Sequence, residues 1–381
     1  MTLIFIGIAI LLVVVVAVLF LGKTAKPTRP AARSSPQRTP ALQGDVRVPV
    51  PAEPIARPET PAMPVEVPAA LASFQFVAHD ALDNERKQAI VAELRRIPRP
   101  PPSLQKLVSR DFVANATSAE LSSIVMGEPL IAAKVLGTVN SPFYGLQKPV
   151  VSIGQAVPFL GFNTVRSVGL QYMLNDSFKS GSPELNKVFD SIWAASALAS
   201  ELCFKIAQKL NLPDQGALVT NMVLSFIGQL ATYSLMPGHV AVSTASLGLL
   251  ERVQAEQAQL GVGSAEIGSL MMQEWALPLS IIEDVRGIDR ILVTPFEAMD
   301  AQRGVRLALC FLCARLGERL AQGTLTDLAT FDLITEQDPD FFHLRSYLAA
   351  PTLARLPEFL HAPDLLASVA QMQEGLQTRQ G

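Results

Sequence analysis

The chain has 381 residues, which is enough for one large domain or two domains of ordinary size. Its net charge of −3 excludes the overall positive field of a nonspecific nucleic-acid binder, so no nucleic-acid partner is expected. Hydrophobic residues make up 49% of the chain and charged residues only 17%, which is apolar for a soluble protein. Three cysteines cannot form a disulfide framework, and so low a number suits a reducing compartment.

Residues 2–22 form an uninterrupted apolar run without charge or proline. At about 1.5 Å per residue, about 20 such residues cross a hydrocarbon core about 30 Å thick. A cleaved signal peptide is the alternative interpretation, but it requires a basic segment before the run, and no charged side chain precedes this one. The sequence therefore predicts a transmembrane helix over 2–22 that stays in the protein.

Positively charged side chains follow this run, and the next residues contain one opposing acid, Asp45, before Glu53. The cations are Lys23, Lys26, Arg29, Arg33, Arg38 and Arg47. The positive-inside rule then places the N-terminus outside and the rest of the chain in the cytoplasm. The same cations also favour the anionic lipid headgroups of the inner leaflet.

Residues 23–79 are predicted to form a disordered, proline-rich linker. Eleven of the 28 prolines lie between residues 23 and 70. Proline lacks the amide donor and disfavours helix at the residue before it, so this segment should be a semi-extended spacer. Pro58–Pro61 and Pro61–Pro64 also have the PxxP spacing of a proline-recognition ligand, but the spacer interpretation is favoured because such matches are frequent in proline-rich sequence.

The rest of the chain has apolar residues at helical spacing. Thr117 and Glu120 have the spacing of a capping box, and Pro129 stands where the first turn of a helix tolerates proline. No run of alternating β-branched residues competes, so the predicted fold class is all-α. Helices are predicted over 82–94, 119–127, 130–139, 152–160, 163–175, 184–209, 214–235, 244–258, 264–273, 278–286 and 296–321.

Two short segments carry a resemblance to a known family. Residues 127–136 contain an acidic-Pro-Leu motif at Glu128 and Pro129, and the turn that follows contains Asn140, Ser141 and Tyr144. Together they resemble the opening signature of the HDOD domain. Looser matches follow in the family's order, and the resemblance spans about 85–320. It implies a multi-helical HDOD/HD-like domain over 80–325, followed by a C-terminal helical extension over 326–381.

The HDOD domain is similar to the HD superfamily of metal-dependent phosphohydrolases. In those enzymes, histidine and aspartate side chains hold a cation that activates water and stabilises phosphoryl charge. The resemblance puts the first histidine position at Ala195 and the His-Asp pair at Ser225 and Phe226, while Ser264 stands where the family often has histidine. Alanine and phenylalanine cannot bind a metal. We therefore expect no catalytic residue, no metal and no cofactor, and a protein that is not an enzyme.

Three other features have competing interpretations. Cys310 and Cys313 form a CxxC within an apolar helix, where two small core residues explain the spacing better than a redox or zinc site. Asn140 and Ser141 precede Pro142, an arrangement that favours a turn closed by side-chain bonds to the local backbone. A ligand contact by Asn140, Ser141 or Tyr144 is about equally compatible with the sequence. The acidic residues after 325 suggest a docking segment or, more favoured, a cap packed on the domain.

The resemblance also implies a role in bacterial signal transduction. The predicted function is a non-enzymatic module, tethered to the bacterial inner membrane, that binds signalling proteins or a ligand. The main alternative is a divergent HD-type metal-dependent phosphohydrolase or nucleotide-binding enzyme that uses other metal ligands. A structural membrane adaptor is a third hypothesis. The sequence names neither the signalling partner nor the oligomeric state.

Overall fold

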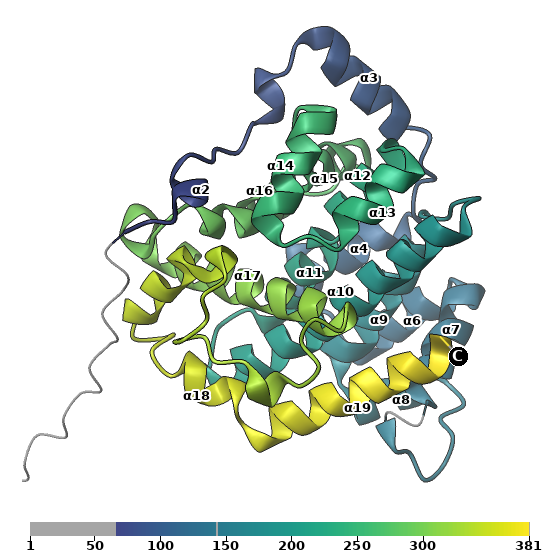
Figure 1. Ribbon diagram of the computed structural model, residues 1–381. Coiled ribbons are helices and arrows are strands. Elements are labelled where there is room, and N and C mark those ends of the chain that lie inside the picture. The colour runs from purple at the N-terminus through teal and green to yellow at the C-terminus, as the bar shows by residue number, and fades with distance from the viewer. Residues whose placement is uncertain (1–65, 142–143, 381) are drawn as a thin grey trace, which may run out of the picture. The chain divides into compact units, whose positions relative to one another are not determined.

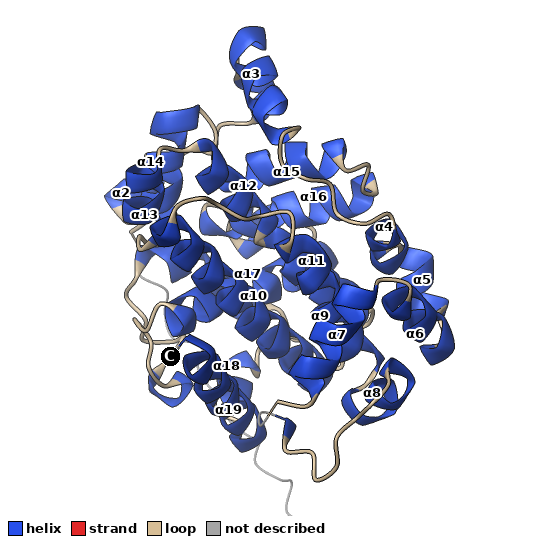
Figure 2. Cartoon of the chain, turned by 90° about the vertical axis from the view of Figure 1, so that its right-hand side faces the viewer, coloured by secondary structure: helices blue, strands red, loops and turns tan. Residues whose placement is uncertain are grey.

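The computed structural model describes residues 66–141 and 144–380. Every regular element in these residues is a helix, which confirms the all-α class (Figure 1, Figure 2). The predicted transmembrane helix over 2–22 and most of the predicted linker lie outside the described residues. Within the described part, the segment Gln215–Leu235 is long and apolar enough to span a membrane, but 83% of it is buried inside the domain, as expected of a core element.

The first described residues pack onto the domain. This segment contains α2 (Ala69–Ala72) and the short 3₁₀ helix η1 (His79–Ala81). Leu71 and Phe74 are buried in the hydrophobic core, and the Val77 amide donates to Gln257 Oε1 at 2.9 Å. The packed body therefore begins before residue 80, within the segment predicted as linker, because apolar side chains reappear there after the prolines.

The N-terminal part of the body consists of short helices, and its capping box is confirmed. The Glu120 amide donates to Thr117 Oγ1, and the Thr117 amide donates to the Glu120 carboxylate at 2.8 Å. Pro129 begins its helix, as predicted. Two helices of six residues, α4 and α5, were too short to show helical periodicity. The helices are α3 (Asn84–Leu94), α4 (Ser103–Val108), α5 (Arg110–Asn115), α6 (Ser118–Met126), α7 (Pro129–Val139), α8 (Ile153–Leu160) and α9 (Phe162–Asn175).

The two longest helices, α10 (Pro183–Lys209) and α17 (Ala301–Ala321), pack along each other at the centre. They come very close at Gly317, where a Cβ atom would lie 2.6 Å from the Ala195 carbonyl oxygen. Cys310 and Cys313 are buried free thiols, which fits their predicted role as core residues. Contact with Cys203 of α10, together with burial, raises the pKa of the Cys310 thiol well above its usual value and makes the thiol unreactive.

The helices between α10 and α17 differ from the prediction at two places. The predicted helix over 214–235 is present from Gln215 to Leu235, but an interruption at Phe226 divides it into α11 and α12. Gly228 follows this break and lies so close to α15 that a Cβ atom would be 2.3 Å from the Ser264 carbonyl oxygen. The predicted helix over 244–258 is replaced by α13 and α14. The elements are α11 (Gln215–Ser225), α12 (Ile227–Leu235), α13 (Gly238–Ala245), α14 (Leu249–Leu260), α15 (Ser264–Glu274), α16 (Leu279–Ile288), η3 (Asp289–Leu292) and η4 (Phe296–Ala298).

The C-terminal extension packs on α10 and α17, which supports the cap interpretation of its acidic stretch (Figure 1). Asp340 is buried, and Phe341 and Phe342 join the core. Arg319 of α17 pairs with Glu336 at 2.8 Å. The elements are η5 (Leu328–Thr330), η6 (Pro339–Phe341), η7 (His343–Ala349), α18 (Leu356–Leu360) and α19 (Pro363–Gln380).

Candidate functional site

A cavity of about 430 Å³ lies between α10, α12, α13 and α17. Val188, Ile192 and Ala195 of α10 form an aliphatic wall, and two buried polar side chains, Gln229 of α12 and Glu318 of α17, also line it. Ala195 is the position that the family resemblance assigns to the first metal-binding histidine. The cavity is therefore the place to compare this chain with the HD hydrolases.

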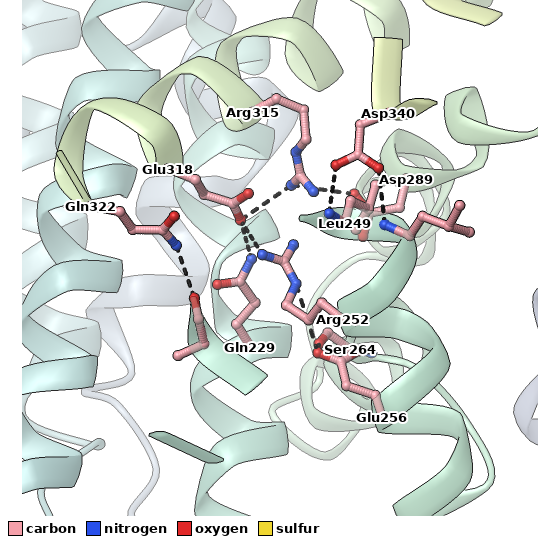
Figure 3. Close-up of polar contacts among 12 residues, drawn as sticks. Gln229, Leu249, Arg252, Glu256, Ser264, Asp289, Arg315, Glu318, Gln322 and Asp340 are labelled. Atoms are coloured by element: carbon pink, nitrogen blue, oxygen red, sulfur yellow. Dashed lines mark hydrogen bonds and ion pairs between the residues drawn. The ribbon is translucent and has the colours of Figure 1, made fainter. Parts of the chain in front are cut away.

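The Glu318 carboxylate is held by three donors (Figure 3). Gln229 Nε2, Arg252 Nη1 and Arg315 Nη2 all approach its Oε1 atom, the two arginines at 3.0 and 3.3 Å. Burial by itself raises the pKa of Glu318, but the two guanidinium groups outweigh it and leave the pKa below its usual value. Glu318 is thus an ionised carboxylate whose charge is compensated by the protein's own cations.

Two further acids extend this buried network. Glu256 Oε1 lies 3.9 Å from Arg252 Nε, and Glu256 Oε2 accepts from the Ser264 amide at 2.7 Å. Asp289 lies 3.8 Å from Arg315. Burial raises the pKa of both Glu256 and Asp289. Within the described residues, two nitrogens of each arginine have no hydrogen-bond partner, so the acids satisfy the two guanidinium groups only in part.

The positions assigned to the HD ligands do not converge. Ala195 lines the cavity, whereas the Ser225 hydroxyl donates to the carbonyl oxygen of Met222 in its own helix at 2.8 Å. Phe226 is buried at the junction of α11 and α12. Ser264 donates to Glu256. No three histidine, cysteine or carboxylate side chains lie close enough to hold a metal ion in the part of the chain that the structure describes.

The Asn140 side chain closes a turn. Its amide nitrogen donates to the carbonyl oxygens of Leu136 and Val150 at 2.9 and 2.8 Å, and its oxygen accepts from the Val150 amide at 2.7 Å. These three bonds support the turn interpretation for this residue. Glu128 accepts from Ser103 Oγ at 2.9 Å, and Pro129 begins α7, so both members of the acidic-Pro pair act in the local structure.

Ser141 and Tyr144 line a smaller cavity of about 130 Å³ between α7, α9, α10 and α19. Thr138 and Tyr172 share a hydrogen bond of 2.7 Å in its lining. The buried Ser200 hydroxyl has no hydrogen-bond partner in the described residues. The cavity is large enough for a few waters or a very small ligand. The ligand interpretation therefore has a structural basis for Ser141 and Tyr144, but not for Asn140.

Sequence reasoning missed the buried polar network beside the cavity lined by Ala195. Gln229, Arg252 and Glu318 belong to three helices that only the fold brings together. Gln229 does lie within the Ile227–Leu230 segment that resembles the family, but the resemblance assigns no role to it. A buried arginine has the same local sequence appearance as an exposed one. The sequence alone therefore gives no indication that these three side chains meet.

Residues 97–290, half of the chain, match the HDOD domain family. This protein therefore belongs to the HDOD domain family. No curated protein matches the chain at a significant level.

The fold is similar to those of three solved proteins. An HDOD domain protein of unknown function from Geobacter sulfurreducens is 17% identical with a TM-score of 0.54, over 76% of this chain and 98% of that one. A protein from Shewanella amazonensis, provisionally named a phosphohydrolase, is 18% identical with a TM-score of 0.50 over the same shares. A protein from Marinobacter aquaeolei, provisionally named a signal transduction protein, is 19% identical with a TM-score of 0.49, over 80% of this chain and 68% of that one. At such identities the likeness to the first two shows the shared fold alone.

Proposed function

We propose that this chain is a non-enzymatic HDOD module, tethered to the cytoplasmic face of a bacterial inner membrane, that signals by binding a partner protein or a ligand. One observation carries the non-enzymatic part. The Glu318 carboxylate, which lines the same cavity as Ala195, is already bound by Arg252, Arg315 and Gln229. A divalent cation would have to displace two guanidinium groups and would be repelled by both of them.

Metal analysis of the full-length protein in detergent tests this part. After expression in medium containing Mn²⁺, Fe²⁺ and Mg²⁺, we expect metal far below one equivalent and no turnover of a phosphodiester substrate. Stoichiometric metal together with turnover would contradict the proposal. The variant Glu318→Gln serves as the control, because turnover that it leaves unchanged does not arise at the Glu318 carboxylate.

The membrane tether is supported by the uncharged run 2–22 and by the lysines and arginines that follow it. We expect the full chain to remain with the membrane fraction after an alkaline carbonate wash. A chain that lacks residues 2–22 should move to the soluble fraction. Protease added outside spheroplasts should leave the helical domain intact, and cleavage of that domain would show that the proposed orientation is wrong.

A further inference from the structure

A second large cavity, of about 750 Å³, lies between α5, α11, α16 and α17, and arginines line it. Arg110 belongs to α5, and Arg303 and Arg306 belong to α17. Three aspartates, Asp214, Asp284 and Asp300, share the lining. The charges of these six side chains cancel formally, so the geometry of their contacts decides which sign of ligand the cavity favours.

The ion pairs between these side chains are loose. Arg110 lies 3.8 Å from Asp284, and Arg306 lies 3.7 Å from Asp214, so neither pair is at hydrogen-bond distance. Arg110 is 67% and Asp214 71% exposed, and such surface pairs contribute little. Arg303 donates from Nη2 to the Glu283 carbonyl oxygen at 3.1 Å. Most of the guanidinium donors in the cavity are therefore available to an incoming acceptor.

The N-terminus of α11 faces the same cavity, since Gln215, Gly216 and Ala217 line it. Asp214 precedes the helix with a left-handed backbone at φ +54°, and its side chain does not cap the helix. The backbone amides of Gln215 and Gly216 form no hydrogen bond to any described residue. Uncapped amides at a helix N-terminus present donors and a partial positive charge to an anion.

A buried arginine stands directly behind this wall. Arg166 is fully buried, and its guanidinium donates to Thr220 Oγ1 and to the Gly216 carbonyl oxygen, both at 2.6 Å. Gly216 and Thr220 both line the cavity. Burial lowers the pKa of Arg166 to about 10, so it still carries its charge at neutral pH. No carboxylate of the described residues pairs with it, and its Nε has no partner there.

Arg166 does not itself line the cavity, and its guanidinium has three neutral acceptors, the Leu107 carbonyl oxygen at 3.2 Å among them, but no counter-ion. A buried cation without a counter-ion is costly, and an anion held a few ångströms away would offset part of that cost. The opposing charges of the cavity lining cancel, so Arg166 and the amide end of α11 leave the wall with a net positive character. An anion that accepts several hydrogen bonds fits this wall better than a neutral or cationic ligand.

We propose that this cavity binds a phosphate-bearing small molecule, held by Arg303, Arg306 and the amide end of α11. Phosphate oxygens suit both donor types, since guanidinium groups bind them in a bidentate manner and helix amides bind them end-on. The site would give the proposed binding module a class of ligand. It rests on the proposed function only in that the protein acts by binding. It is separate from the cavity lined by Ala195 and Glu318.

Isothermal titration calorimetry tests the site. Inorganic pyrophosphate is titrated into the full-length protein in detergent at low salt. We expect saturable binding that Arg306→Gln weakens roughly tenfold, as the loss of a charge-assisted contact predicts. Asp214→Asn should strengthen binding a few-fold, because it removes the negative charge beside Arg306 and keeps a residue that tolerates the left-handed backbone. Arg355→Gln, which changes an exposed arginine immediately before α18 and outside this cavity, should have no effect.

Absence of saturable binding would overturn the proposal. Equal effects of Arg306→Gln and Arg355→Gln would also overturn it, because the pyrophosphate would then respond only to overall charge. Tighter binding of pyrophosphate by Arg306→Gln would also overturn the proposal, because Arg306 would then not hold the anion. None of these outcomes bears on metal content or turnover, so the failure of this site and the failure of the proposed non-enzymatic function can be told apart.

Discussion

Asp340 lies in the C-terminal extension, yet its buried carboxylate caps a helix of the HDOD domain. It accepts hydrogen bonds from the amides of Leu249 and Leu250, at 2.5 and 3.0 Å, at the start of α14 (Figure 3). The substitution Asp340→Ala leaves both buried amides without an acceptor. We therefore expect the free energy of unfolding to fall by about 1–3 kcal/mol, which urea unfolding followed by circular dichroism would measure.

Glu358→Ala provides the control for Asp340→Ala. Glu358 forms an exposed pair with Arg355 at 2.9 Å on the same extension, so its removal should change the free energy of unfolding by less than about 1 kcal/mol. If both variants lose the same small amount, Asp340 does not anchor the extension to α14.

Glu256 makes stability depend on pH, because burial raises its pKa above the ordinary value of 4.5 and the nearby Arg252 offsets this only in part. The folded protein then holds this proton more tightly than the unfolded chain does. The contribution to stability is full below about pH 4.5 and is lost as pH rises through the raised pKa. The variant Glu256→Gln has no titratable group at this position. The free energy of unfolding of the wild type, relative to that of the variant, should therefore fall as pH rises from about 4.5 through the raised pKa.

Urea unfolding of both proteins at several values between about pH 4 and about pH 8 measures this difference. A difference that stays constant with pH would mean that Glu256 titrates alike in the folded and unfolded chains.

The residues of the candidate sites were only partly predictable, for a physical reason. Asn140 and Ser141 could be identified because a turn is a local structure whose side-chain bonds span few residues. Glu318 and Arg252 could not, since they lie 66 positions apart in the chain and only the fold brings them into an ion pair. The sequence places Arg166 in an amphipathic helix. Only the fold shows that no carboxylate of the described residues pairs with it.

Close contact between α10 and α17 makes Gly317 sensitive to any added atom. A Cβ atom there would lie 2.6 Å from the Ala195 carbonyl oxygen and 2.8 Å from Ala199 Cβ. Gly317→Ala must separate the two central helices, so we expect it to lower the free energy of unfolding by about 1–3 kcal/mol. Differential scanning calorimetry would record this as a lower melting temperature.

The same substitution at Gly137 should act in the opposite direction. Gly137 is exposed on α7, and its added Cβ atom would meet no atom within 4 Å. Gly137→Ala should stabilise the protein by up to about 1 kcal/mol through helix propensity alone. Stabilisation by both substitutions would contradict the close α10–α17 contact.

The long helices were predictable because their apolar periodicity repeats over several turns. The prediction of 184–209 differs from α10 by one residue at its start. The break at Phe226 was not predictable, since the apolar helical pattern continues on both sides of it, and it accompanies the approach of Gly228 to α15. Periodicity describes one helix at a time and carries no information on which neighbour it meets.

For the whole molecule, the start of the folded body is the boundary on which the sequence and the structure differ. The proline content predicts a linker up to residue 79, but Leu71 and Phe74 lie in the core. The Phe74 and Phe76 rings pack edge to face, with centroids 5.0 Å apart. His79 lies 2.7 Å from the buried Glu266 of α15. Composition shows where proline disfavours helix. Burial depends on a few apolar side chains, which change the average composition of the segment very little.

A comparison of two soluble chains, 66–381 and 80–381, tests where the folded body starts. The shorter chain loses the buried side chains of Leu71 and Phe74, each of which contributes about 1.5–3 kcal/mol, and leaves their pocket exposed to water. We therefore expect chain 80–381 to unfold at a lower urea concentration and to bind a hydrophobic dye more strongly. Equal unfolding midpoints would mean that residues 66–79 rest on the surface without stabilising it, and the linker would then extend to residue 79 as the proline pattern predicts.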